Sequence, residues 1–209
     1  PVAEPVSAAE RGMLTRVAKF TPPAGRVDGT GAAYLLSRRP NGAFRALNAL
    51  FAAGAQVSVT SAPAETAEGT EGSAFVVSGV GRDAIEKVAR EQSLAVKAVA
   101  MAPAATSVKK PRVGLYRSWT ANIDEGWTRW ILENYGFAPV TLRNDGIQAG
   151  NLRERFDAII LPDSSARSIR DGFGPGIVPG EYSGGLGAQG ATALREFVQA
   201  GGVLIAFNN

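Results

Sequence analysis

The first clear alternation of apolar and polar positions lies between residues 31 and 101 and predicts a small α+β unit. Short apolar runs typical of strands are separated by two stretches with helical period. Their order is strand, helix, strand, strand, helix, strand, which is the split βαβ arrangement of a two-layer sandwich. The expected strands are 32–36, 56–60, 74–77 and 94–99, and the expected helices carry Phe44 to Phe51 and Ile85 to Ala89 on their apolar faces.

Local signals add detail at three places in the first half of the chain. Ser7 and Glu10 have the spacing of a capping box, which predicts a short helix near the N-terminus. Asp83 and Glu86 have the same spacing at the start of the second helix of the α+β unit. Residues 62–72 contain Pro, Gly, Thr and Glu without an apolar period, so a loop is expected there.

The pattern also divides the chain. Residues 1–30 are rich in Ala, Pro and Gly and are interpreted as an irregular lead-in with at most one short strand, and residues 102–110 as a linker. Residues 111–209 then alternate strands with helices, which predicts an α/β domain with a right-handed, doubly wound parallel sheet. The expected strands are 112–116, 139–142, 156–163 and 203–207, with helices from Asn122 to Asn134 and around Leu194, and a short polar helix or turn at 147–155.

The 209 residues include no Cys and no His, and these two absences restrict the chemistry. Without Cys there is no disulfide framework, thiolate zinc site or cysteine nucleophile. Without His there is no Ser-His-Asp triad, histidine metal ligand or ordinary near-neutral general base. Because the chain begins at Pro1 and stops at Asn209 directly after an apolar run, we expect it to be a piece of a longer protein.

Charge and hydropathy narrow the expected partners. The net charge is +3, and no block of five or more basic residues is present, so the sequence does not indicate nucleic-acid binding. No apolar run approaches the roughly 20 residues that a membrane span needs. We therefore expect neither a nucleic-acid partner nor a membrane span, and localisation cannot be inferred from these features.

The sequence places its best candidate crevice at Asp163, at the carboxyl end of the most apolar strand, where open α/β sheets bind ligands. A long Gly/Pro/Ser-rich loop follows, and loops of that length are often functional. The preferred interpretation is simpler, because these groups alone do not specify a reaction: Asp163 caps the next turn and Arg170 pairs with Asp171 or Glu181. The candidate ligand-binding residues are Asp163, Ser164, Arg167, Glu181, Tyr182 and Trp119.

The remaining motifs have structural interpretations. Gly185 to Gly190 matches the letters G-x-G-x-x-G, but a loop precedes it and the chain ends before the acid of a dinucleotide site, so a glycine-rich turn into a helix is expected. Trp127 and Trp130 share a helical face, which predicts core packing, whereas Trp119 beyond a strand end is free to line a pocket or an interdomain contact. The acids at 124 and 125 complement a helix dipole.

Several motifs in the second half of the chain form a distinctive set. They are 111–116 with Trp119, 124–129, 132–137, 156–163, 180–187 and 194–202. Together they resemble the region downstream of the catalytic domain in large bacterial zinc carboxypeptidases of the carboxypeptidase A kind. That region is similar to the flavodoxin-like fold of class I glutamine amidotransferases. The resemblance covers most of residues 30–209.

What this resemblance implies about activity is mostly negative. The family builds its zinc site from His-x-x-Glu and a later His, which this chain lacks, so zinc is expected only in a catalytic domain outside it. The amidotransferase nucleophile position, after 203–207, is held by Asn208. The resemblance therefore implies a non-catalytic accessory region, without catalytic or metal-binding residues, whose partner is the peptidase domain of a secreted or periplasmic protein. A small-ligand-binding domain with its site around Asp163 and a self-associating, homodimeric module remain as alternatives.

Overall fold

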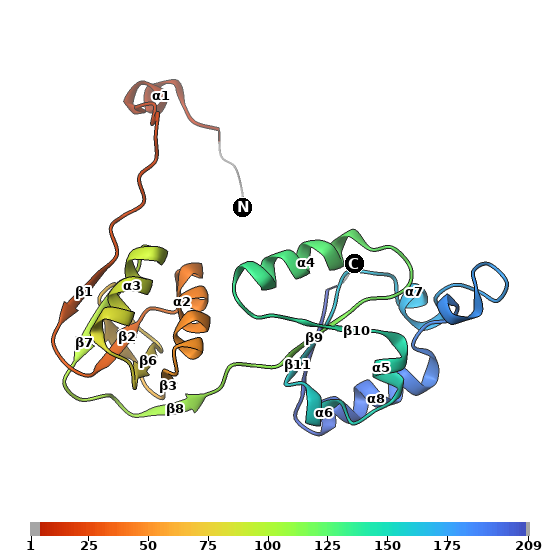
Figure 1. Cartoon of the computed structure of the whole chain (residues 1–209). Coiled ribbons are helices and arrows are strands. Elements are labelled where there is room, and N and C mark those ends of the chain that lie inside the picture. The colour runs from red at the N-terminus through yellow and green to blue at the C-terminus, as the bar shows by residue number, and fades with distance from the viewer. Residues whose placement is uncertain (1–4, 208–209) are drawn as a thin grey trace.

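The computed structural model describes residues 5–207, and it shows an α/β protein with a mixed six-strand sheet, a small hairpin and a four-strand parallel sheet. The two larger sheets belong to two units that follow one another along the chain, joined by the extended segment after residue 108 (Figure 1). Before the first unit, a short helix, α1 (Ala8–Met13), begins at the expected capping box. The Ser7 backbone N–H donates to Glu10 at 2.8 Å, and the Glu10 N–H donates to the Ser7 hydroxyl at 3.3 Å.

The first unit follows the element order expected from the hydrophobic pattern. Helices α2 (Asn41–Ala52) and α3 (Arg82–Gln92) pack beside each other on the mixed sheet, whose strands run in the order β1-β7-β2-β6-β3-β8 (Figure 1). Only the β1–β7 pair is parallel. The strands are β1 (Arg26–Gly29), β2 (Ala33–Leu36), β3 (Gln56–Thr60), β6 (Phe75–Ser78), β7 (Ala95–Val99) and β8 (Ala105–Val108).

The two outer strands of this sheet lie in segments that the sequence pattern did not assign to it. Strand β1 falls within the expected lead-in and β8 within the expected linker. Each pairs with the sheet along one side only, and most of its residues are exposed. Each contributes only one valine, Val27 or Val108, to the core, and a single apolar side chain gives no period for a sequence pattern to detect.

Two local expectations for this unit are wrong. Residues 62–72 form a hairpin, β4 (Ala64–Thr66) and β5 (Gly69–Glu71), because polar groups replace an apolar core: the Thr66 hydroxyl donates to the Gly69 carbonyl at 2.9 Å. Helix α3 has no capping box. Gly81 occupies its N-cap, and Glu86 instead accepts from Arg82 at 2.7 Å, in an i,i+4 ion pair.

The second unit is an all-parallel sheet in the order β10-β9-β11-β12. Strand β9 lies between β10 and β11. The connection that follows β9 leads to β10, whereas the connection that follows β11 leads to β12 on the other side, so the direction reverses at the carboxyl ends of β9 and β11. Ligands bind at such reversal points in open α/β sheets. The elements are β9 (Val113–Tyr116), α4 (Ile123–Asn134), β10 (Val140–Leu142), α5 (Asn144–Gln148), α6 (Leu152–Arg155), β11 (Ala158–Leu161), α7 (Ala166–Asp171), η1 (Gly180–Tyr182, a 3₁₀ helix), α8 (Gly187–Gln199) and β12 (Val203–Ala206).

Helices cover both faces of this sheet, but unequally. The larger core lies under α5, α6 and α8, where Ile159, Leu161 and Phe197 are buried. A smaller core lies on the opposite face, where Leu132 and Phe137 pack against buried residues of β9 and β11. The two units also contact each other, because the Asn48 side-chain amide of α2 donates to the backbone carbonyl of Tyr135, at the end of α4, at 2.8 Å.

The expected core packing of Trp127 and Trp130 is wrong. Both side chains lie on α4 but are 59% and 58% exposed, and they pack edge to face against each other with ring centroids 6.0 Å apart. The spacing placed them correctly on one helical face, but that face points away from the sheet. All four residues of β12 are also exposed, so α4 and β12 both present apolar surface.

An ion-pair cluster joins the starts of β9 and β11. The Asp157 carboxylate accepts hydrogen bonds from the Arg112 backbone N–H at 2.9 Å, the Arg112 guanidinium at 3.0 Å and Arg153 at 2.7 Å. These hydrogen bonds, and above all those from Arg112, hold the pKa of Asp157 well below its ordinary value of 3.8.

We expect Asp157→Asn to lower the free energy of unfolding at pH 7 by about 1 kcal/mol, a value reduced because the side chain is partly solvent-screened. A carboxyl group with a depressed folded-state pKa stabilises the fold above its unfolded pKa and loses that effect as the pH falls further. The difference between the two proteins in urea denaturation should therefore shrink below about pH 4. A difference that stays constant from pH 7 to pH 3 would contradict this assignment.

Candidate functional site

A crevice opens at the carboxyl ends of β9 and β10, beside the start of α4. Arg117 is the first residue after β9, and Arg143 is the first residue after β10. The crevice has a volume of about 800 Å³, within the range usual for ligand pockets. We call it the arginine crevice; it is lined by Arg117, Ser118, Trp119, Thr120, Ala121, Asn122, Ile123, Glu125 and Arg143.

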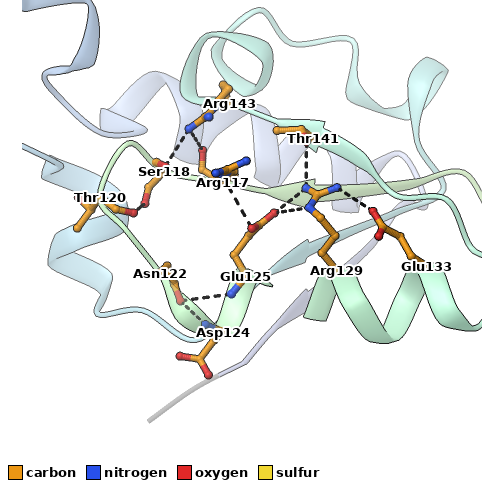
Figure 2. Close-up of polar contacts among 10 residues, drawn as sticks. All are labelled: Arg117, Ser118, Thr120, Asn122, Asp124, Glu125, Arg129, Glu133, Thr141 and Arg143. Carbon is orange, nitrogen blue, oxygen red and sulfur yellow. Dashed lines mark hydrogen bonds and ion pairs between the residues drawn. The ribbon is translucent and has the colours of Figure 1, made fainter. Parts of the chain in front are cut away.

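Arg143 organises the wall of the crevice. Its guanidinium Nη1 donates to the backbone carbonyls of Arg117 at 3.2 Å and Ser118 at 3.0 Å (Figure 2). The guanidinium carbon also lies 3.8 Å from the centroid of the Trp119 ring. The Ser118 hydroxyl in turn donates to the Thr120 carbonyl at 2.9 Å. Arg143 therefore holds the loop between β9 and α4 in place, through hydrogen bonds to the loop backbone and a cation–π contact with Trp119.

The base of the crevice is a nearly buried carboxylate. The Glu125 side chain is 7% exposed and accepts from the Arg129 guanidinium at 2.6 and 2.9 Å, while Arg117 lies 3.9 Å away (Figure 2). Arg129 also donates to the Thr141 hydroxyl at 3.0 Å, which connects α4 to β10. Glu125 therefore orients the arginines, rather than merely complementing the dipole of α4.

Asn122 fixes the start of α4 against the neighbouring strand. Its side-chain oxygen accepts from the backbone N–H groups of Asp124 at 2.8 Å and Glu125 at 3.3 Å, as an N-cap does. Its amide nitrogen donates to the backbone carbonyl of Asp163 at 2.7 Å. The candidate residue Asp163 is in this way held next to the arginine crevice.

The crevice keeps two like charges close together. Burial lowers the pKa of Arg143, and the positive charge of Arg117 lowers it further, whereas the carboxylates of Glu125 and Asp145 act in the opposite direction. Guanidinium groups remain protonated and offer several N–H donors in a planar fork, so they bind anions instead of transferring protons. An anion between Arg117 and Arg143 would relieve their mutual repulsion.

A second hollow, of about 560 Å³, shares Trp119 and Arg143 with the crevice. We call it the acidic hollow because Asp145 and Glu181 line it. The Trp119 ring contacts Tyr182 edge to face, with centroids 4.8 Å apart. The remaining lining residues are Asn144, Gln148, Ser183, Gly184 and Gly185.

Buried polar contacts hold the long loop against this hollow. The Tyr116 hydroxyl donates to the Asn144 side-chain oxygen at 2.7 Å, and the Asn144 amide donates to the Gly184 carbonyl at 3.1 Å. Burial raises the pKa of Tyr116 to about 12, so this phenol stays protonated and acts as a fixed hydrogen-bond donor. The loop is therefore anchored to β9 and α5.

The structure brings only some of the sequence candidates together. Trp119 and Glu181 line the acidic hollow, Tyr182 contacts the Trp119 ring from outside its lining, and Asp163 lies beside the arginine crevice. Neither Ser164 nor Arg167 is among the lining residues of either hollow.

Other expectations for the loop have mixed outcomes. Ser165 caps α7, accepting from the Ser168 N–H at 3.1 Å, and the expected pairing of Arg170 with Asp171 is present at 2.7 Å. Gly185 lies against the backbone of Arg170, where an added Cβ would come within 2.5 Å, so close packing accounts for a glycine at that position. Asn208, the expected degenerate nucleophile position, lies outside the described residues.

The sequence reasoning missed Arg117 and Arg143 and explained Glu125 only by the helix dipole. A usable signal was present, because Arg117 and Arg143 directly follow strands whose carboxyl ends meet at one edge of a parallel sheet. The rule that selected Asp163 would have selected both arginines if it had been applied to every strand. Within residues 5–207, no group of three or more His, Cys, Asp or Glu side chains is placed to hold a metal ion.

The fold and the site together describe an α/β protein with an arginine-lined crevice at the carboxyl edge of a parallel sheet. Comparison with known protein families, with curated proteins and with solved structures found no match. In the part of the chain that the structure covers, no helix is both long and apolar enough to cross a membrane.

Proposed function

We propose that this chain is a non-catalytic accessory unit of a zinc carboxypeptidase-like protein and that its arginine crevice binds a carboxylate-bearing ligand. The sequence resemblance supports the peptidase context, with zinc held by a peptidase domain outside these residues. The all-parallel order β10-β9-β11-β12 supports a doubly wound, amidotransferase-like fold for the second unit. In this proposal the partner is the peptidase domain of the same protein, in the periplasm or outside the cell.

The single observation that carries the binding proposal is the convergence of Arg117 and Arg143 on one crevice. Charged hydrogen bonds from guanidinium groups to a carboxylate are short, strong and directional. The chain has no His and no Cys to supply an ordinary general base or a thiolate nucleophile at this place. Binding is therefore the activity for which the residues of the crevice are best suited.

The test is calorimetric titration of the protein with succinate, and with its neutral analogue succinamide. We expect heat of binding for succinate only. Arg117→Gln should weaken succinate binding about tenfold, because one charge-assisted hydrogen bond is lost. Arg195→Gln is the matched control: it removes the same charge from an exposed position on α8 and should leave binding unchanged. Equal affinity of the Arg117→Gln and wild-type proteins would refute the proposal.

A further inference from the structure

The arginine crevice and the acidic hollow have opposite charge and a common wall. Arg117 and Arg143 line the first, Asp145 and Glu181 line the second, and Trp119 and Arg143 border both. A ligand that occupies the two together would meet cations at one end and carboxylates at the other. The arrangement therefore favours a ligand with a negative group at one end and a positive group at the other, which an anion site alone does not specify.

At the acidic end, the two carboxylates form no close ion pair, although Arg143 also lines this hollow and interacts electrostatically with Asp145. Among the described residues, neither Asp145 nor Glu181 takes part in an ion pair within 4.0 Å, whereas Glu125 at the other end is paired with two arginines. An ammonium group carries three donors and fits between such acceptors. The acidic hollow is therefore complementary to an amine.

Size argues for a ligand that reaches from one hollow to the other. The two volumes, about 800 and 560 Å³, are far larger than a lone carboxylate requires. The wall that the two hollows share is aromatic, because Trp119 lines both, is 39% exposed and is supported by an edge-to-face contact with Tyr182. Such a wall suits peptide groups and small side chains.

We infer that the ligand is a short peptide with free ends, whose terminal carboxylate binds between Arg117 and Arg143 and whose terminal amine binds beside Asp145 and Glu181. This inference rests on the proposed carboxylate binding and adds the second charged end. The peptide lies across the stacked side chains of Trp119 and Arg143, so both termini are recognised by groups that flank one aromatic surface.

The test compares three probes by calorimetry: Ala-Ala-Ala, its N-acetyl derivative and its C-terminal amide. Free Ala-Ala-Ala should bind tightest, and amidation should weaken binding about tenfold. N-acetylation should weaken binding about threefold to fivefold, as expected for the loss of a solvent-exposed ion pair. In the Glu181→Gln protein the penalty of N-acetylation should shrink, whereas Glu68→Gln, at an exposed position between β4 and β5, should leave it unchanged.

The outcomes separate the two claims. If the N-acetyl peptide binds wild-type protein as tightly as the free peptide does, the amine site is refuted while carboxylate binding stands. If succinate binds but no peptide does, the inference is likewise refuted. If the amide binds as tightly as the free acid, the carboxylate site itself fails, and the proposed function fails with it.

Discussion

Glu125→Ala is expected to lower the free energy of unfolding of the second unit by about 2–3 kcal/mol. Removing one partner of a buried ion pair leaves the other charge uncompensated, which costs about 3–5 kcal/mol in a fully buried site. The cost is smaller here because the Arg129 side chain remains 22% exposed. The same change removes the carboxylate near Arg117, so the crevice should also lose its fixed geometry.

Glu133 provides a matched control. Its carboxylate lies 3.8 Å from the guanidinium of the same Arg129, one helical turn further along α4, but its side chain is 57% exposed. Glu133→Ala should therefore cost less than about 0.5 kcal/mol. Urea denaturation followed by tryptophan fluorescence measures both, because all three Trp residues lie in the second unit. Equal losses in the two variants would show that Glu125 has no special role.

Phe197→Ala should produce the largest loss of stability of all the changes considered, about 3–5 kcal/mol. The Phe197 side chain is 2% exposed and belongs to the larger core of the second unit. Its ring lies directly against Gly202, where even an added Cβ would come within 2.3 Å of it. Truncation leaves a cavity between α8 and the sheet that the rigid surroundings fill only in part.

The neighbouring residue on α8 is the control for this prediction. Val198 is exposed, and Val198→Ala should change stability by no more than about 0.5 kcal/mol in either direction. The tryptophan-monitored urea transition should move to lower concentration for Phe197→Ala alone. A Phe197→Ala protein that unfolds at the wild-type urea concentration would show that α8 does not pack on the sheet as described.

The order of helices and strands was predictable because it depends on apolar periodicity, which is a property of residues close together in the sequence. The buried strands β2, β9 and β11 and the amphipathic helix α3 each have a run or a stripe that a pattern detects. The hairpin at 64–71 was not predictable in this way. Its stability comes from polar contacts such as that of Thr66, and from backbone pairing, neither of which has an apolar period.

The candidate site was predictable only in part, since it depends on which strands become neighbours. Trp119, Arg143 and Glu181 are far apart in sequence, yet the fold brings all three to one hollow. Trp127 shows what a helical pattern leaves undetermined. The period identifies a common face, but it does not determine which face turns toward the sheet.

Helix α4 begins at the arginine crevice and ends at the hydrogen bond between Asn48 and the Tyr135 carbonyl. Its 12 residues span roughly 18 Å and form a stiff rod with one end at each unit. The arginine crevice and the contact with α2 of the first unit therefore lie at opposite ends of one continuous helix.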